Sequence, residues 1–284
     1  MFEIVLWTLM LIGVSDLGVL TSAEDESCVC GQRSTFSFRI AGGKVAKEGS
    51  HPWQAAIFSP RKGFACGGSV ITDWHILSSG YCIRGLWWVK GWKVRLGTVD
   101  RLSNKGELFD VTEWFVHPKY HALTDTPISD IVIGKLNRKI TFGELIQPIC
   151  LNNNGRIDLT NRRAIAIGWG MEESEGPLVR RLREASVPVS SDWRCSKSTI
   201  GSVFRPELML CTSSYPKGPC PGDEGGSLML EVDETYMMLI GIISYVEDCA
   251  ESTGVVTYTK VSVFHKWIES VTADAKKCQP PQFA

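Results

Sequence analysis

The stretch Cys220–Gly226 (CPGDEGG) decides how this chain is interpreted, because it sets two acidic residues between a cysteine and a glycine pair. Alone, such a short motif is common and carries little weight. Four further motifs accompany it along the chain: His51–Gln54 (HPWQ), Cys66–Ile71 (CGGSVI), Gly168–Gly170 (GWG) and Tyr258–Ser262 (YTKVS). Their shared order, rather than any one of them, makes the pattern specific.

Two more stretches belong to the same order, Phe38–Gly43 (FRIAGG) and Ser129–Val132 (SDIV). The whole arrangement, from Arg39 to Ala273, resembles the trypsin-like serine proteases of the chymotrypsin fold. The resemblance implies an all-β protein made of two six-stranded antiparallel β-barrels, with the active cleft between them and one helix at the C-terminal end.

Composition and periodicity agree with a β-rich globular chain. Of 284 residues, 44% are hydrophobic and 21% charged, and the net charge of -1 argues against a polyanion binder driven by bulk charge. The 27 glycines and 10 tryptophans suit short strands and tight turns. Strands are predicted at Trp92–Thr98, Leu108–Val116, Ala164–Gly168, Tyr236–Tyr245 and Val255–Val261, and an amphipathic helix at Ser262–Ala275.

The N-terminal segment is predicted to be a secretory signal peptide. Ile4–Val14 is an apolar run, and Thr21–Ala23 offers small residues for cleavage, although Glu3 and the lack of lysine or arginine before the run are unusual. The run is too short to span a bilayer, and an uncleaved anchor is the alternative. The predicted division is residues 1–23 signal peptide, 24–39 propeptide or light-chain segment, 40–273 protease-like domain and 274–284 tail.

The resemblance breaks at two of the three catalytic positions. Where the family has TAAHC, this chain has Ser78–Cys82 (SSGYC), so Tyr81 stands at the position of the general-base histidine. Where the family has GDSGG, Glu224 stands at the nucleophile, and only Asp130 matches the triad. In the family's mechanism, the serine attacks, the histidine takes its proton and the aspartate orients the histidine.

Neither replacement can perform that chemistry. A phenol with a pKa of about 10 is a poor base at neutral pH. A carboxylate is a poor acyl nucleophile, and it would place negative charge beside Gly222, the oxyanion-hole position. Losing this linked set costs on the order of 10⁶ in turnover. The chain is therefore expected to be an inactive homologue.

The residues at the substrate-pocket positions differ from those of the family, whereas the activation-site residues match. Gly218 stands at the base of the specificity pocket, and Val246 and Val256 stand at wall positions that are usually glycine, so the pocket is expected to be narrowed or closed. Arg39–Ile40 and Asp223 match the activation switch, in which cleavage frees an isoleucine amine that pairs with the aspartate. Two interpretations stay open: a cut that remodels a binding surface, or an inherited feature that is never cleaved.

Ten cysteines behind a signal peptide indicate disulfides in an oxidising compartment, and therefore a secreted protein. A zinc site is not supported, because only Cys28 and Cys30 are closely spaced, and no cofactor is expected. The resemblance implies the bridges Cys66–Cys82, Cys195–Cys211 and Cys220–Cys249, and a bridge from Cys28 or Cys30 to Cys150. For Cys278 and the remaining cysteine, a second tether, a covalent partner and a free thiol all stay open.

The function expected from these residues is protein binding or regulation. The partner is an unidentified protein, for which an active protease, an inhibitor or a cell-surface protein are candidates, and neither nucleic acid nor a membrane span is expected. The alternatives are a hydrolase with residual or altered activity and a decoy for inhibitors or substrates of active relatives. Trp87, Trp88 and Trp92 follow Tyr81 closely, and they either anchor a partner or cover the edge of their own barrel.

Overall fold

The computed structural model describes residues 28–33, 43–121, 127–173, 175–213, 217–234, 236–246, 249 and 254–281. The predicted signal peptide at residues 1–23 and the predicted cleavage site Arg39–Ile40 lie outside the described residues. In the described part of the chain, no helix is both long and apolar enough to cross a membrane.

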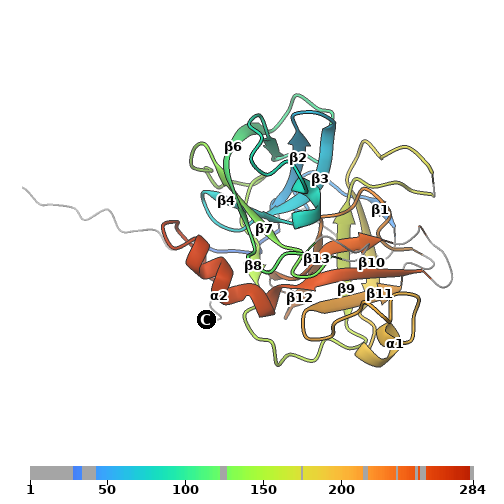
Figure 1. Ribbon diagram of the computed structural model, residues 1–284. Helices are drawn as coiled ribbons and strands as arrows, with labels where there is room; N and C mark the ends of the chain where they lie inside the picture. The colour runs from blue at the N-terminus through green and yellow to red at the C-terminus, as the bar shows by residue number, and fades with distance from the viewer. Residues whose placement is uncertain are drawn as a thin grey trace, which may run out of the picture.

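The first unit is a closed antiparallel barrel in which β2, β3, β4, β7, β6 and β5 are hydrogen-bonded in that order (Figure 1). Its strands are β2 (Gln54–Ser59), β3 (Gly63–Val70), β4 (His75–Ser78), β5 (Lys93–Leu96), β6 (Glu107–Val116) and β7 (Val132–Leu136). Side chains alternate along β6, since Phe109 is buried while Leu108 is 44% exposed. This alternation follows from the two-residue period of a strand with one face on a core.

The second unit is an eight-stranded sheet with the order β1-β10-β9-β12-β13-β14-β11, and β8 runs parallel to β13. Its strands are β1 (Lys44–Val45), β8 (Cys150–Leu151), β9 (Arg163–Gly168), β10 (Arg183–Pro188), β11 (Met209–Ser213), β12 (Ser227–Val232), β13 (Tyr236–Val246) and β14 (Val255–Lys260). An isolated bridge between Val189 and Thr212 brings the chain after β10 back to β11. The predicted all-β fold is confirmed as a six-stranded closed barrel and a half-barrel. The second unit differs from the predicted six-stranded antiparallel barrel, because it has eight strands and β8 pairs in parallel with β13.

Two short helices and one longer helix complete the fold. These are the 3₁₀ helix η1 (Gly80–Ile83), α1 (Asp192–Ser196) and α2 (Val261–Val271). In α2 the buried side chains recur at Val261, Phe264 and Ile268, which is the spacing of one helical face. The helix ends earlier than the predicted Ala275, because Thr272 caps it: its N–H and its hydroxyl both donate to the Ile268 carbonyl, at 3.0 and 2.8 Å.

All ten cysteines are disulfide-bonded. Three bridges lie within the barrels: Cys66–Cys82, Cys195–Cys211 and Cys220–Cys249. Of the two candidates, Cys30 joins Cys150, and Cys28 joins Cys278 near the C-terminal end. The N-terminal segment is therefore tied to the domain at two points, and its strand-like bridge from Val29 to Gln279 runs beside the C-terminal tail.

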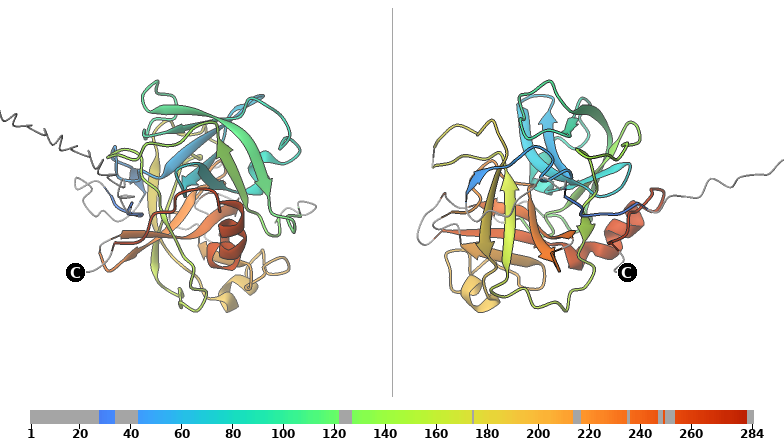
Figure 2. Two further views of the ribbon diagram at one scale, coloured as in Figure 1. Left: turned by 90° about the vertical axis from the view of Figure 1, so that its left-hand side faces the viewer. Right: turned by 180° about the vertical axis from the view of Figure 1, so that it is seen from behind.

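One hydrophobic cluster spans the two units, and the second unit adds clusters of its own. A single cluster of buried side chains includes Trp53 and Ile57 of the first barrel and Trp169 and Met229 of the second. The Trp53 Nε1–H donates to the Met229 sulfur at 3.0 Å, and the Trp169 Nε1–H donates to the Val99 carbonyl at 2.9 Å. In the two further views of Figure 2 the barrels remain in contact along one face. This seam holds the cleft in place.

Neighbouring residues of β6 give a matched test of this core. Phe109→Ala is expected to lower the free energy of unfolding by about 3–5 kcal/mol, because it removes a buried ring from a packed interior. Leu108→Ala, on the exposed face of the same strand, is expected to change it by less than about 0.5 kcal/mol. Chemical denaturation of both variants measures the difference, and equal effects would contradict the inward and outward assignment.

Candidate functional site

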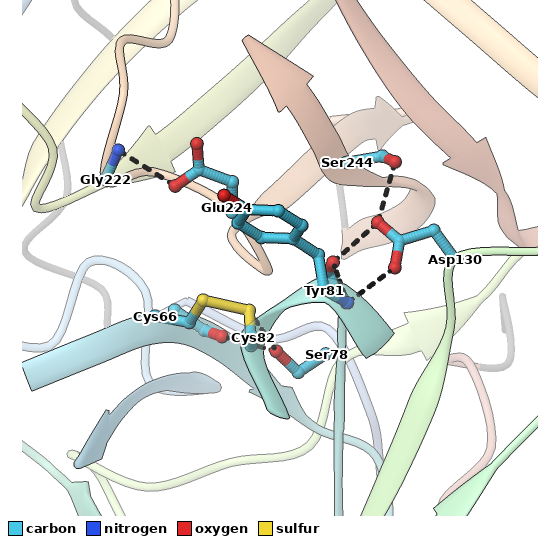
Figure 3. The surroundings of a disulfide bond; sticks show 10 residues. Cys66, Ser78, Tyr81, Cys82, Asp130, Gly222, Glu224 and Ser244 are labelled. Atoms are coloured by element: carbon cyan, nitrogen blue, oxygen red, sulfur yellow. Dashed lines mark hydrogen bonds between the residues drawn. A yellow bond between two sulfur atoms is a disulfide. The ribbon is translucent and has the colours of Figure 1, made fainter. Parts of the chain in front are cut away.

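Tyr81 lies on the short helix that follows β4. Ser79 caps this helix, and its hydroxyl accepts the Tyr81 N–H at 3.1 Å. The adjacent bridge Cys66–Cys82 ties the helix to β3. Tyr81 itself is 43% exposed, so its side chain is reached by solvent and is not part of the core. Figure 3 draws it between Asp130 and Glu224.

Asp130 is buried at the seam of the two barrels and is fully hydrogen-bonded. Its Oδ2 accepts the hydroxyl of Ser79 at 2.6 Å and the hydroxyl of Ser244 at 2.7 Å. Its Oδ1 accepts the Tyr81 N–H at 2.8 Å. Its backbone carbonyl accepts the Thr259 hydroxyl at 2.7 Å. The donors come from η1, β13 and β14, so this one residue connects both barrels (Figure 3).

Burial sets the protonation of Asp130. Loss of hydration raises its pKa to about 6, and the hydroxyls of Ser79 and Ser244 and two backbone N–H groups hold it from rising further. Hydrogen-bond donors to a carboxylate favour the charged form, while the low dielectric disfavours it. The resulting group is a structural acceptor with no imidazole to orient.

Glu224 turns its carboxylate back on its own loop. Its Oε2 accepts the N–H of Gly222 at 2.8 Å, and its backbone carbonyl accepts the Gly67 N–H at 2.9 Å (Figure 3). Burial raises the pKa of Glu224, the backbone N–H groups of Glu224 and Gly222 lower it, and the charge of Asp130 raises it slightly. The Gly222 N–H, at the predicted oxyanion-hole position, is therefore already occupied by a carboxylate from the same chain.

The described part of the chain offers no substitute for the missing pair. None of its serine hydroxyls is hydrogen-bonded to an imidazole. The nearest such arrangement is Thr72 Oγ1 to His75 Nδ1 at 2.9 Å, and both residues are buried away from the cleft. Ser227, three residues past Glu224, is buried and bonds to the Ser69 hydroxyl at 2.7 Å.

The specificity-pocket positions are filled by apolar side chains. Val246 and Val256 are both buried, and both belong to the hydrophobic cluster of the second barrel. They face each other across the β13–β14 pairing. Gly218 instead lines a cavity of about 280 Å³ on the other side of the loop. The narrowing or closure of the specificity pocket stays a prediction.

Asp223 lines the same cavity, together with Gly43 and Gly170. Its carboxylate accepts the N–H of Gly170 at 2.5 Å and the N–H of Cys220 at 2.9 Å. Among the described residues no lysine or arginine is ion-paired with it. Burial raises its pKa to about 7, the two backbone N–H groups lower it, and the neighbouring Glu224 raises it. The two backbone donors compensate in part for burying this carboxylate.

Comparison with known proteins identifies the architecture. The family model described as Trypsin matches residues 40–268. The chain belongs to the trypsin family. It is 31% identical over 254 residues to the proclotting enzyme of Tachypleus tridentatus, covering 84% of this chain and 68% of that protein. It is 32% identical over 244 residues to the vitamin K-dependent protein C of Mus musculus, covering 82% of this chain and 51% of that protein, about half of its length.

Sequence reasoning missed the groups that donate hydrogen bonds to the carboxylates of Asp130 and Glu224. Ser79 stands where the family motif TAAHC has alanine, and that substitution was the one available signal for its hydrogen bond to Asp130. The contact of Ser244 and the turn of Glu224 toward Gly222 had no signal in the sequence, since both depend on side-chain direction. The described residues also include no cluster of three or more side chains suited to a metal ion.

The protonation of Asp223 gives a testable pH dependence. In the folded chain Asp223 holds its proton up to about pH 7, whereas an unfolded chain releases it near about pH 4. Between these values the folded state binds more protons, so the free energy of unfolding decreases as the pH rises and then levels off. Asp223→Asn is expected to weaken this decrease, as measured by chemical denaturation from about pH 4 to about pH 8.

Asp233→Asn, on an exposed turn, is the matched control and is expected to keep the wild-type pH profile. Asp130 contributes in the same direction up to about pH 6 in all three proteins, so the comparison isolates Asp223. Parallel profiles for Asp223→Asn and wild type would rule out a raised pKa at Asp223.

Proposed function

We propose that this protein is a secreted, catalytically inactive member of the trypsin family that acts by binding another protein. The observation that carries the proposal is the hydrogen bond from the Gly222 N–H to the Glu224 carboxylate. Acyl transfer needs that N–H to stabilise a developing oxyanion. Here a carboxylate of the same chain already accepts it, and a second anion would be repelled from the same point.

Proton transfer fails on the other side of the cleft as well. A general base must accept a proton near neutral pH, and Tyr81 supplies no imidazole for that role. The carboxylate of Asp130 cannot take over, because the hydroxyls of Ser79 and Ser244 and the Tyr81 N–H already use its oxygens. Every group that the family uses for chemistry is thus absent or engaged in a structural contact.

Binding is favoured over a purely vestigial chain because the scaffold is complete. All ten cysteines are bridged, the barrels share a core, and the seam at Asp130 is satisfied. Five bridges also fit an oxidising compartment, where such bonds form and persist, and this supports secretion. The partner is proposed to be a protein, with an active protease, an inhibitor and a cell-surface protein as the candidates.

Restoration of the catalytic pair is the sharpest test. The wild-type protein is expected to remain unlabelled by a small active-site-directed fluorophosphonate and to hydrolyse small esters at the background rate. The double variant Tyr81→His/Glu224→Ser rebuilds the triad around Asp130 and frees the Gly222 N–H, so it is expected to gain labelling. Adding Ser79→Ala, which frees Asp130 Oδ2 to receive an imidazole, is expected to increase it.

Mass spectrometry of the intact protein reads the labelling, before and after cleavage following Arg39. Glu224→Ala alone is the control, since it opens the oxyanion position without adding a nucleophile. Wild-type labelling, or ester turnover that disappears in Glu224→Ala, would contradict the proposal and favour a hydrolase with altered chemistry.

A further inference from the structure

Two tryptophans stand out on the loop that follows η1. Trp87 is 53% exposed and Trp88 is 64% exposed. Their rings contact each other edge to face, with centroids 5.2 Å apart. Exposing more than half of two large aromatic side chains is unfavourable in water, and such residues commonly anchor protein interfaces. The sequence left open whether the three tryptophans here face a partner or their own barrel.

The third tryptophan answers this by holding the loop in place. Trp92 is buried, it packs edge to face on Trp114 with centroids 5.6 Å apart, and its Nε1–H donates to the Leu86 carbonyl at 3.2 Å. The Val89 N–H donates to the same carbonyl at 3.0 Å. The exposed pair is thus carried on a fixed turn, and little conformational entropy is lost when it binds.

The chain segment that carries this pair is rich in positive charge, and its nearest acidic neighbour across the β5–β6 pairing, Asp110, is ion-paired with Lys93. The sequence from Trp74 to Val99 contains no aspartate or glutamate. Arg84 and Lys90 are exposed on the loop, and Arg61 and Lys62 are exposed on the β2–β3 turn. The loop and the turn lie side by side, as shown by Gly91, where an added β-carbon would be 3.3 Å from the Pro60 Cβ. None of these four cations is ion-paired with a residue that the structure describes.

We name this surface the tryptophan platform and define it as Trp87, Trp88, Arg84, Lys90, Arg61 and Lys62. We propose that the tryptophan platform binds an acidic, aromatic-bearing segment of a partner protein. The inference rests on the proposed function, because it supplies the surface through which a protein without catalysis would act. Cations around exposed rings attract carboxylates electrostatically, while the rings stack on the partner's aromatic side chains.

The observations favour a protein segment over a lipid surface. On the loop from Tyr81 to Gly91, the exposed large hydrophobic residues are Tyr81, Trp87 and Trp88, while the aliphatic Leu86 and Val89 are only partly exposed. Arg84 lies over the Tyr81 ring, 5.3 Å from its centroid, so the platform continues to the rim of the degenerate cleft. Insertion into acyl chains requires a broad apolar face, which two rings on a turn do not provide. A bound segment can instead run from the platform along the cleft.

The test uses a defined probe, a random copolymer of glutamate and tyrosine, with the purified full chain. Isothermal titration calorimetry is expected to detect binding that weakens as salt is raised. Trp87→Ser/Trp88→Ser is expected to weaken it at least about tenfold, as loss of an interface anchor does. Arg84→Glu/Lys90→Glu is expected to weaken it similarly and to reduce its dependence on salt.

Two matched variants control for composition. Trp193→Ser removes a tryptophan that is 73% exposed on α1 in the second barrel, and Lys266→Glu reverses a charge on α2. Both are expected to bind the copolymer as the wild type does. Poly-glutamate, which lacks rings, is expected to bind at least about tenfold more weakly.

The platform assignment is overturned if the tryptophan variant binds normally, if the controls lose binding equally, or if phosphatidylserine vesicles bind while the copolymer does not. These outcomes leave the proposed loss of catalysis untouched, because fluorophosphonate labelling tests that separately. Conversely, fluorophosphonate labelling of the wild-type protein would contradict the proposed function even if the platform binds the copolymer.

Discussion

The geometry of the cleft depends on one buried carboxylate that joins two barrels. Asp130 receives the hydroxyl of Ser79 from the first barrel and the hydroxyl of Ser244 from the second, while its backbone carbonyl receives the Thr259 hydroxyl. A charge buried without such donors costs several kcal/mol, about 3–5 when a partner is removed. The seam therefore fixes the relative position of the barrels, and with it the distance across which Tyr81 and Glu224 face each other.

This arrangement gives Asp130 a structural role that does not depend on catalysis. In a triad one carboxylate oxygen is reserved for an imidazole. Here a serine hydroxyl has taken that place, at 2.6 Å from Oδ2. A neutral hydroxyl compensates less than a cation, so burial leaves the pKa of Asp130 raised to about 6. Asp130 hydrogen-bonds to both units, and its presence alone says nothing about turnover.

The sequence predicted the strands and the disulfide bridges. It did not predict features that depend on the direction in which individual side chains point. The strand β13 was predictable because its sequence is an apolar run, as suits a strand that is paired on both sides. The three disulfide bridges within the barrels were predictable because the family resemblance implied them. The end of α2 was not, because the cap at Thr272 decides it. The sequence also did not predict that Trp88 is exposed while Trp92 is buried. The path of the turn determines which of the two rings packs on Trp114.

Exposed side chains without ion pairs to described residues lie on the tryptophan platform, whereas the polar groups around Asp130 and Gly222 already have partners. Inside the cleft the Gly222 N–H, the Tyr81 N–H and the Asp130 oxygens all have partners within the chain, so a ligand there would have to break existing hydrogen bonds. On the platform beside it, two rings and four cations face water without ion pairs to described residues. A surface gains most free energy on binding where its groups are exposed and held in place. Under the proposed function, the tryptophan platform at the rim is therefore the part of the molecule best able to recognise a partner.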